Sequence, residues 1–215
     1  MMKVIAINGS PRKNRNTAQL LKSALDGAES VGAKTELIHL YDLNFKGCIS
    51  CFACKRVGSK CNGLCAVNDD AKPVLEKILG CDALLLGSPI YFGNVTGEMR
   101  SFIERLIFPN LSYDVGKRSV FRGSLNSAFI YTMNVTQESV KTIGYNDVFN
   151  HYKNLLQILN GDSEFFASTD TYQFDDYSLY HASRYDALHK AKVKDTQFPK
   201  DLDAVFSIGA RLGNG

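Results

Sequence analysis

The chain has 215 residues, of which 45% are hydrophobic and 22% charged, and its formal net charge is +3. This composition provides enough apolar side chains for a buried core, which excludes a largely disordered protein. The basic residues are scattered, whereas nucleic-acid binding typically needs a stripe of Lys and Arg with interleaved aromatics. We therefore expect no nucleic-acid partner.

The sequence shows neither a membrane-span pattern nor a signal-peptide pattern. No apolar run approaches the roughly 18 residues of a membrane span. The first residues, MMKVIAINGSP, reach Gly, Ser and Pro before a signal-peptide core can form. We therefore expect a cytoplasmic protein without membrane contact, in a compartment that keeps thiols reduced.

The first part of the chain predicts a strand, a helix and a second strand. Residues 3–8 form a short apolar run that ends in Gly-Ser-Pro, and residues 35–40 form a similar run. Between them, a helix from Thr17 to Gly32 has its apolar face formed by Leu20, Leu21, Ala24, Leu25 and Ala28. A helix that connects two strands in this way predicts a parallel sheet.

The same alternation continues to the end of the chain. In chain order it predicts a helix that begins near Asn68 and Asp69, a strand at 82–93, a helix over 99–107, a strand at 127–132, a helical region over 149–159, a strand at 164–169 and a helix over 202–212. Five strands alternating with five helices predict a single doubly wound α/β domain over residues 1–215 with flavodoxin-like strand order 2-1-3-4-5. Ligands of such sheets bind beyond the carboxyl ends of the strands at the switch point, here the loops that start at Asn8 and Gly87.

The loop after the first strand reads NGSPRKNRNTAQLL. It matches neither the Walker A pattern nor G-x-G-x-x-G. It does offer polar groups where a helix begins, namely Ser10, Asn14, Asn16 and Thr17, with Arg12 adding a positive charge. Free N–H groups and the helix dipole favour a phosphate at such a place. The alternative is an ordinary helix cap, with Asn16 capping and Arg12 in solvent.

The loop after the third strand reads GSPIYFGNVTG. Gly87, Gly93 and Gly97 allow a close approach of the backbone, and Pro89 stiffens the exit from the strand. The aromatic pair Tyr91 and Phe92 lies at the strand tip, where a flat ligand can stack. The alternative is that both rings pack into the core.

Five of the six cysteines lie between residues 48 and 65. Cys48, Cys51, Cys54 and Cys61 follow C-x2-C-x2-C-x6-C, whose opening spacing is that of bacterial ferredoxins and predicts a 4Fe–4S cluster. Cys65 is an alternative fourth ligand. A zinc site or a set of unmetallated thiols are the two other interpretations, although zinc sites usually separate two C-x2-C pairs by a long loop.

The remaining candidate groups have structural interpretations. Cys81 is expected to be a buried core thiol. The four histidines, His39, His151, His181 and His189, show no metal spacing and are expected to be structural or surface residues. The tyrosine-rich stretch within residues 170–198 predicts an arm, either at a subunit contact or as an exposed excursion.

These motifs together resemble the flavodoxin-fold NAD(P)H-dependent FMN reductases and, within them, the iron–sulfur flavoproteins. The resemblance is carried by GSPRKNRNTAQLL, CISCFACKRVGSKC, DDAKPVLEKI, GSPIYFGNVTGEMRSFIERL and FPKDLDAVFSIGARL, and it is weak only between about residues 110 and 190. It places the cysteine-rich insertion at about residues 47–66. The ferredoxin proline after the last cysteine is absent, since Asn62 follows Cys61.

The resemblance implies a flavin site and its chemistry. It assigns the FMN phosphate to Ser10, Arg12, Asn16 and Thr17, and the ring and ribityl groups to Pro89, Ile90, Tyr91, Phe92, Gly93, Asn94, Thr132, Met133 and Asn134. No side chain is expected to act as acid or base, because the flavin accepts and passes on the electrons.

The implied partners are small molecules and copies of the same chain. NAD(P)H or a ferredoxin-like protein is the expected electron donor, and a quinone, a flavin or another small molecule the acceptor. We expect a homodimer or homotetramer. The alternatives are an electron carrier without its own substrate, a cluster-free NAD(P)H-dependent FMN or quinone reductase, and a regulatory or zinc-binding module on the same fold.

Overall fold

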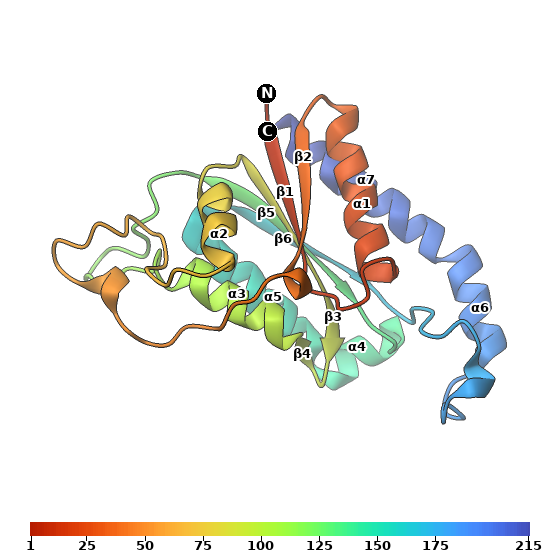
Figure 1. Cartoon of the computed structure of the whole chain (residues 1–215). Coiled ribbons are helices and arrows are strands. Elements are labelled where there is room, and N and C mark those ends of the chain that lie inside the picture. Colours follow the sequence, from red (N-terminus) through yellow and green to blue (C-terminus); the bar gives the residue numbers. More distant parts are fainter.

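The computed structural model describes residues 1–215 and is built around one parallel sheet with the order β2-β1-β3-β5-β6 (Figure 1). The strands are β1 (Lys3–Asn8), β2 (Lys34–His39), β3 (Ala83–Tyr91), β5 (Leu125–Thr132) and β6 (Asn160–Ser168). The order is the predicted one. A further two-residue strand, β4 (Asn94–Val95), pairs antiparallel with the end of β3, so the sheet has six strands and not five.

Helices cover both faces of the sheet (Figure 1). They are α1 (Asn16–Ser30), α2 (Ala71–Leu79), α3 (Gly97–Ile107), α4 (Gln137–Ile143), α5 (Tyr145–Leu156), α6 (Ala187–Thr196) and α7 (Phe198–Asn214). One core cluster joins α1 and α7 to Val4, Ala6 and Leu85, and the other joins α2, α3 and α5 to Ile5 and Ile7. Successive residues of the central strands point to opposite faces, so burial of both faces requires the continuous apolar runs seen in the sequence.

Several element boundaries differ from the prediction. The second helix begins at Ala71, two residues after the predicted cap, and Asp69 Oδ1 accepts a hydrogen bond from Ala71 N at 3.2 Å. The helical region predicted over 149–159 is α5 followed by a 3-10 turn, and the short helix α4 precedes it. The C-terminal arm (residues 170–198) contains α6, whose polar sequence carries no apolar stripe that could have predicted it.

Helices α1 and α7 pack with their backbones almost in contact. A Cβ on Gly209 would lie 1.7 Å from the Ala24 carbonyl oxygen, and one on Gly27 would lie 2.0 Å from the Phe206 carbonyl oxygen. Only glycine permits this approach. The packing fixes α1 along its length, and the N-terminus of α1 lies at the carboxyl ends of the strands (Figure 1).

The turn between β3 and β4 carries backbone strain. Phe92 has φ of 50° and Gly93 has φ of 81°, both in the left-handed region. Glycine adopts this region freely, whereas an aromatic residue does so at a cost. The Phe92 side chain is fully exposed at the tip of the turn. No helix of the protein combines the length and apolarity that a membrane crossing would need.

Candidate functional site

A pocket of about 390 Å³ lies at the carboxyl ends of β1, β3 and β5. Its walls come from the loop before α1, the end of β3, the segment after β5 and the C-terminal arm. The lining residues are Ser10, Arg12, Arg15, Asn16, Thr17, Pro89, Ile90, Tyr91, Phe92, Thr132, Met133, Asn134, Thr171, Gln173 and Tyr185. The volume is in the range of small-molecule sites, and the place is the predicted switch point.

The structure thus brings together every predicted cofactor residue except Gly93 and Asn94. Gly93 lies in the β3–β4 turn, and Asn94 is the first residue of β4. The Asn94 side chain is directed to α5, where its Oδ1 accepts a hydrogen bond from Tyr152 Oη at 2.7 Å. Whether the gathered residues bind a cofactor stays a prediction.

The N-terminus of α1 opens onto this pocket without a cap. Arg15 and not Asn16 occupies the N-cap position, no side chain accepts a hydrogen bond from the first turn, and that turn has no acidic residue. Asn16 instead donates through Nδ2 to the Tyr172 carbonyl oxygen at 2.9 Å. Uncapped N–H groups at the positive end of the helix dipole, next to the exposed Arg12 guanidinium, suit an anionic group such as a phosphate.

Hydroxyl groups tie the walls of the pocket together. Thr17 Oγ1 and Thr132 Oγ1 lie 2.8 Å apart and both side chains are buried, so the start of α1 is joined to the end of β5. Ser10 N donates to Asn8 Oδ1 at 2.9 Å, and Ser10 Oγ accepts from Arg12 N at 3.2 Å. These contacts fix the first loop before any ligand binds.

The opposite side of the pocket suits a flat, partly polar ligand. Tyr91 and Phe92 are exposed at the end of β3, which excludes the alternative that both rings are core residues. Asn134 donates through Nδ2 to Gln173 Oε1 at 2.9 Å, but its own Oδ1 is buried without a partner. A buried acceptor of this kind is costly unless something supplies a donor. The uncapped helix, the exposed rings and this acceptor fit a phosphorylated flavin.

Sequence reasoning missed four lining residues: Arg15, Thr171, Gln173 and Tyr185. Arg15 lies inside the quoted loop, and its place directly before the first helical residue could have signalled it. The other three belong to the C-terminal arm. Nothing in the local sequence of the arm indicates that it folds back over the first loop.

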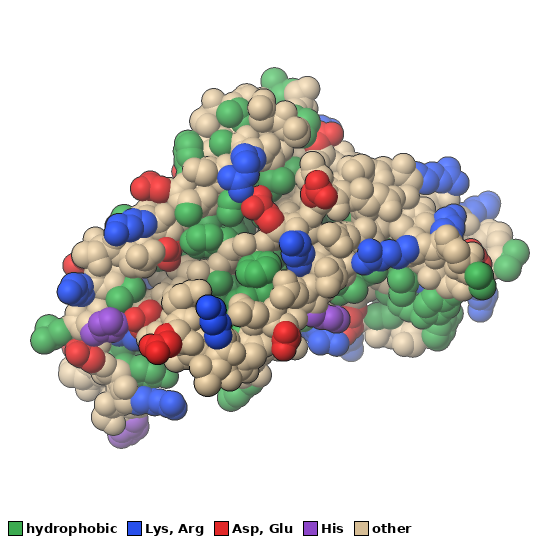
Figure 2. Space-filling view, turned by 180° about the vertical axis from the view of Figure 1, so that it is seen from behind, with side chains coloured by type: hydrophobic (Ala, Val, Ile, Leu, Met, Phe, Trp, Pro, Cys, Tyr) green, Lys and Arg blue, Asp and Glu red, His purple; other side chains and the backbone are tan.

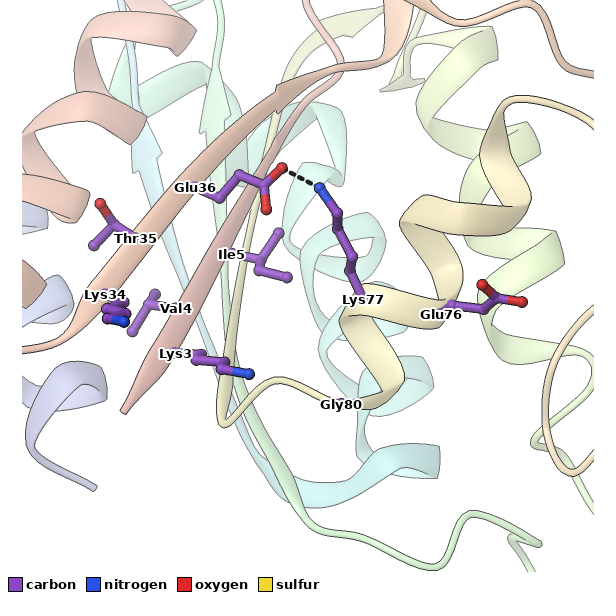
Figure 3. Close-up of a pocket in the computed structure, with 9 residues that line it drawn as sticks. All are labelled: Lys3, Val4, Ile5, Lys34, Thr35, Glu36, Glu76, Lys77 and Gly80. Carbon is purple, nitrogen blue, oxygen red and sulfur yellow. Dashed lines mark hydrogen bonds and ion pairs between the residues drawn. The ribbon is translucent and has the colours of Figure 1, made fainter. Parts of the chain in front are cut away.

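A second hollow of about 490 Å³ lies at the other end of the sheet (Figure 3). It is bounded by the starts of β1 and β2 and by α2, and Lys77 Nζ reaches across it to Glu36 Oε1 at 2.5 Å. Only two of its nine lining residues are hydrophobic, and both ends of the ion pair are about half exposed. It lies at the amino ends of the strands, where doubly wound sheets do not bind their ligands.

The cysteine loop (residues 47–66) projects from the far side of the molecule relative to α6 (Figure 1). Three of the predicted ligands, Cys48, Cys51 and Cys54, line one small pocket together with Cys65, whereas Cys61 does not line it. Cys61 Sγ is instead 3.8 Å from the Ala53 carbonyl oxygen. No group of three or more Cys, His, Asp or Glu is placed to hold a metal ion. The residue types suit an iron–sulfur cluster, but their arrangement in this structure does not.

Both ends of the cysteine loop are held by Arg105 on α3. Its buried guanidinium donates to Lys46 O at 3.2 Å before the loop, and to Val67 O at 3.1 Å and Asp69 Oδ2 at 2.5 Å after it. The Nε group lies 3.3 Å from the sulfur of the buried Cys65. One side chain therefore closes a loop that has no regular secondary structure beyond one 3-10 turn.

Several large apolar side chains are exposed around the cysteine loop, among exposed charged residues such as Arg56 and Lys117. The apolar side chains are Ile49, Phe52, Val57, Tyr113 and Val115. Figure 2 shows hydrophobic side chains gathered at this end of the molecule. Lys55 lies over the Phe108 and Tyr113 rings at 4.8 and 5.3 Å from their centroids, and burial lowers the pKa of its amine.

The other predicted structural residues occupy local roles. Cys81 is partly buried, and burial raises the pKa of its thiol to about 12. His39 Nδ1 lies 2.9 Å from Asn8 Nδ2, and burial lowers the pKa of the imidazole, which favours its neutral form. His189 pairs with Asp170, while His151 and His181 are exposed.

The fold belongs to the class of doubly wound α/β sheets, and a helix end suited to an anion lies at its switch point. Within that class, the sequence profile of the family described as NADPH-dependent FMN reductase matches residues 2–137, more than half of the chain. The chain belongs to this family.

Curated relatives of this chain are named iron–sulfur flavoproteins. An iron–sulfur flavoprotein of Archaeoglobus fulgidus is 44% identical over 104 residues, which cover 48% of this chain and 48% of the relative. An iron–sulfur flavoprotein of Methanocaldococcus jannaschii is 39% identical over 104 residues, or 48% of this chain and 51% of the relative. The match to this chain thus spans about half the length of these relatives.

Solved structures share the fold over nearly the whole chain. An NAD(P)H:quinone oxidoreductase from Methanothermobacter marburgensis superimposes with a TM-score of 0.70 at 16% identity, covering 98% of this chain and 96% of the other. An FMN-dependent NADH-azoreductase from Bacillus anthracis, in complex with FMN, gives a TM-score of 0.66 at 13% identity, covering 98% and 99%. At these identities the likeness concerns the fold alone.

Proposed function

We propose that the protein is an FMN-dependent oxidoreductase that passes electrons from NAD(P)H to a small acceptor such as a quinone or a free flavin. The observation that carries the proposal is the convergence of three segments on one pocket: the uncapped start of α1, the exposed rings of Tyr91 and Phe92, and the unpartnered amide oxygen of Asn134. Membership of the NADPH-dependent FMN reductase family supports the same ligand.

The chain's own residues bind and orient the flavin. Arg12 and the first-turn N–H groups of α1 would hold the phosphate, and Tyr91 and Phe92 would hold the ring. Asn134 Oδ1 would accept a hydrogen bond from the bound flavin, which would remove the cost of its missing partner. When bound, FMN supplies hydride and single-electron transfer, so the pocket needs no side chain as acid or base.

The test is flavin binding followed by turnover. The absorption spectrum of anaerobically purified protein, before and after addition of FMN, is expected to show bound flavin. Oxidation of NADPH or NADH in the presence of a quinone is expected to exceed the rate of free FMN at equal concentration. A protein that binds FMN without such turnover is an electron carrier, and one that binds no flavin refutes the proposal.

A 4Fe–4S cluster held by Cys48, Cys51, Cys54 and Cys61 is a second part of the proposal. Its support is the C-x2-C-x2-C-x6-C spacing and the names of the curated relatives. It requires Cys61 to move to the pocket that Cys65 now shares with the other three thiols. Iron and sulfide analysis of Cys61→Ser and Cys65→Ser decides which of the two cysteines is the fourth ligand. Only the variant that lacks the fourth ligand is expected to lose iron.

Location and assembly complete the proposal. The proposed location is the cytoplasm, where thiols stay reduced, and the proposed donor in the cluster-bearing case is a ferredoxin-like protein. The proposed assembly is a homodimer or homotetramer, which light scattering on the purified chain tests. Zinc instead of iron by metal analysis, with no flavin, would support the zinc-module alternative.

A further inference from the structure

One wall of the flavin pocket is a strap of the C-terminal arm, residues 171–186. It contributes Thr171, Gln173 and Tyr185 to the lining. Apart from the single 3-10 turn Tyr177–Leu179, the strap has no regular secondary structure. Its position over the pocket therefore depends on side-chain contacts more than on a backbone ladder.

The two ends of the strap are firmly attached. At one end, Asp170 N donates to Val135 O at 2.7 Å, and the Asp170 carboxylate receives hydrogen bonds from Lys190 and His189. Lys190 is only 3% exposed and also donates to Asn134 O at 2.8 Å. At the other end, Asp186 caps α6. Buried or capped contacts of this kind fix both ends of the segment.

The middle of the strap is held at Tyr172 and Gln173 by the part-buried hydrogen bonds from Asn16 and Asn134 described above. Two exposed contacts add to them. Arg12 donates through Nη1 to Gln173 O at 2.7 Å. Arg15 forms a two-pronged ion pair with Asp175, with Nη1 at 2.6 Å from Oδ1 and Nη2 bonded to Oδ2. The Arg15 and Asp175 side chains are 42% and 68% exposed. Exposed ion pairs are weak and screened by salt, so this contact can open readily.

We propose that the Arg15–Asp175 ion pair is a latch that holds the strap closed over the pocket and controls the rates at which a flavin enters and leaves. The inference rests on the proposed FMN site. A latch that is closed in the free protein slows entry and exit together, because opening precedes both steps. It therefore changes the two rates and leaves the dissociation constant nearly unchanged, unlike a direct ligand of the flavin.

Riboflavin separates the latch from phosphate binding, because it has the ring but lacks the phosphate that Arg15 could contact directly. In Asp175→Asn, we expect association and dissociation rates of riboflavin to rise together by about two- to fivefold, the effect expected of one exposed ion pair. Stopped-flow quenching of riboflavin fluorescence measures both rates. Asp176→Asn is the matched control, because Asp176 is the next residue and bonds only to Ser178.

Salt and a charge swap provide further readouts. Wild-type riboflavin release is expected to accelerate from 50 mM to about 500 mM NaCl, whereas release from Asp175→Asn stays constant, because only the wild type has an ion pair to screen. The double variant Arg15→Asp with Asp175→Arg is expected to restore slow, salt-dependent release.

The outcomes are distinct. Unchanged rates in Asp175→Asn, or faster release with a matching loss of affinity, overturn the latch while leaving the flavin site intact. A wild-type protein that binds neither FMN nor riboflavin refutes the proposed function itself.

Discussion

Replacement of Arg105 by Met is expected to destabilise the protein through the cysteine loop. Methionine retains the apolar stem of the side chain but removes every donor of the guanidinium. Four groups then lose a partner inside the protein: the Asp69 carboxylate, the carbonyl oxygens of Lys46 and Val67, and the Cys65 sulfur. The two ends of the loop lose their shared contact at the same time.

The size of the expected loss in stability follows from the burial of Arg105 and Asp69. The Arg105 side chain is 0% exposed and that of Asp69 is 19% exposed. Breaking a buried ion pair by removing one partner costs about 3–5 kcal/mol, and water that reaches Asp69 favours the lower end of that range. We therefore expect a loss of about 3 kcal/mol, or a Tm lower by about 6–12 °C for a chain of this length. Lysine at this position keeps the positive charge but lacks the several N–H donors of the planar guanidinium. The loss of stability in Arg105→Lys is therefore expected to lie between zero and that of Arg105→Met.

Urea unfolding followed by circular dichroism measures the loss, and titration with a thiol reagent reports on the loop. Cys65 is 9% exposed, so we expect one additional fast-reacting thiol in Arg105→Met. Arg100→Met is the control on the same helix, because Arg100 is exposed and pairs only with Glu104; its effect should stay within about 0.5 kcal/mol. If Arg105→Met cost no more than Arg100→Met, the buried guanidinium would not be the clamp of the loop.

Four further predictions test other parts of the structure. Arg12→Met is expected to weaken the affinity for FMN at least about tenfold and to leave the affinity for riboflavin nearly unchanged. Lys13→Met removes only a surface pair with Asp42, so neither affinity should change in a fluorescence titration. Gly209→Ala should cost several kcal/mol in thermal unfolding because its Cβ meets the Ala24 carbonyl oxygen, while Gly97→Ala meets no atom within 4 Å and should be nearly neutral. Burial alone would raise the pKa of Asp170, but Lys190 and His189 hold it below its usual range. The stability that Asp170 contributes is therefore present above the ordinary carboxyl pKa and lost as pH falls through the lower folded value, and unfolding curves of Asp170→Asn should lack this acid-side decline. Cys81, whose pKa burial raises to about 12, should stay unreactive toward iodoacetamide at pH 8.5 in native protein and react on unfolding.

The sheet could be predicted because its central strands, β1, β3 and β5, are buried on both faces. A run such as Ala83–Leu86 has no polar position, and in a doubly wound fold that pattern belongs to a central strand. The place of the pocket followed from the same rule, since ligands of such sheets lie at the switch point. For β1, α1 and β3, the hydrophobic pattern of the sequence therefore predicts the same arrangement that the folded sheet shows.

Contacts between distant segments could not be predicted in this way. Arg15 and Asp175 are separated by 160 positions, and Arg105 meets the end of the cysteine loop from another helix. Spacing alone also favours Cys61 over Cys65, whereas the fold places Cys65 beside Cys48, Cys51 and Cys54. Each of these contacts depends on how a loop packs against the sheet and its helices. The periodicity of apolar residues predicts helices and strands but carries no information on the path of a loop.

The close packing of α1 against α7 has a consequence for binding. Because backbone meets backbone at Gly27 and Gly209, α1 can neither slide along its axis nor rotate without a clash. The N–H groups at its start are therefore already oriented when the chain finishes folding, and the entropy of ordering them is lost then and not when an anion arrives. Affinity at the pocket is in this sense set by rigidity built into the opposite end of the chain, and loosening α7 should weaken binding without touching a single lining residue.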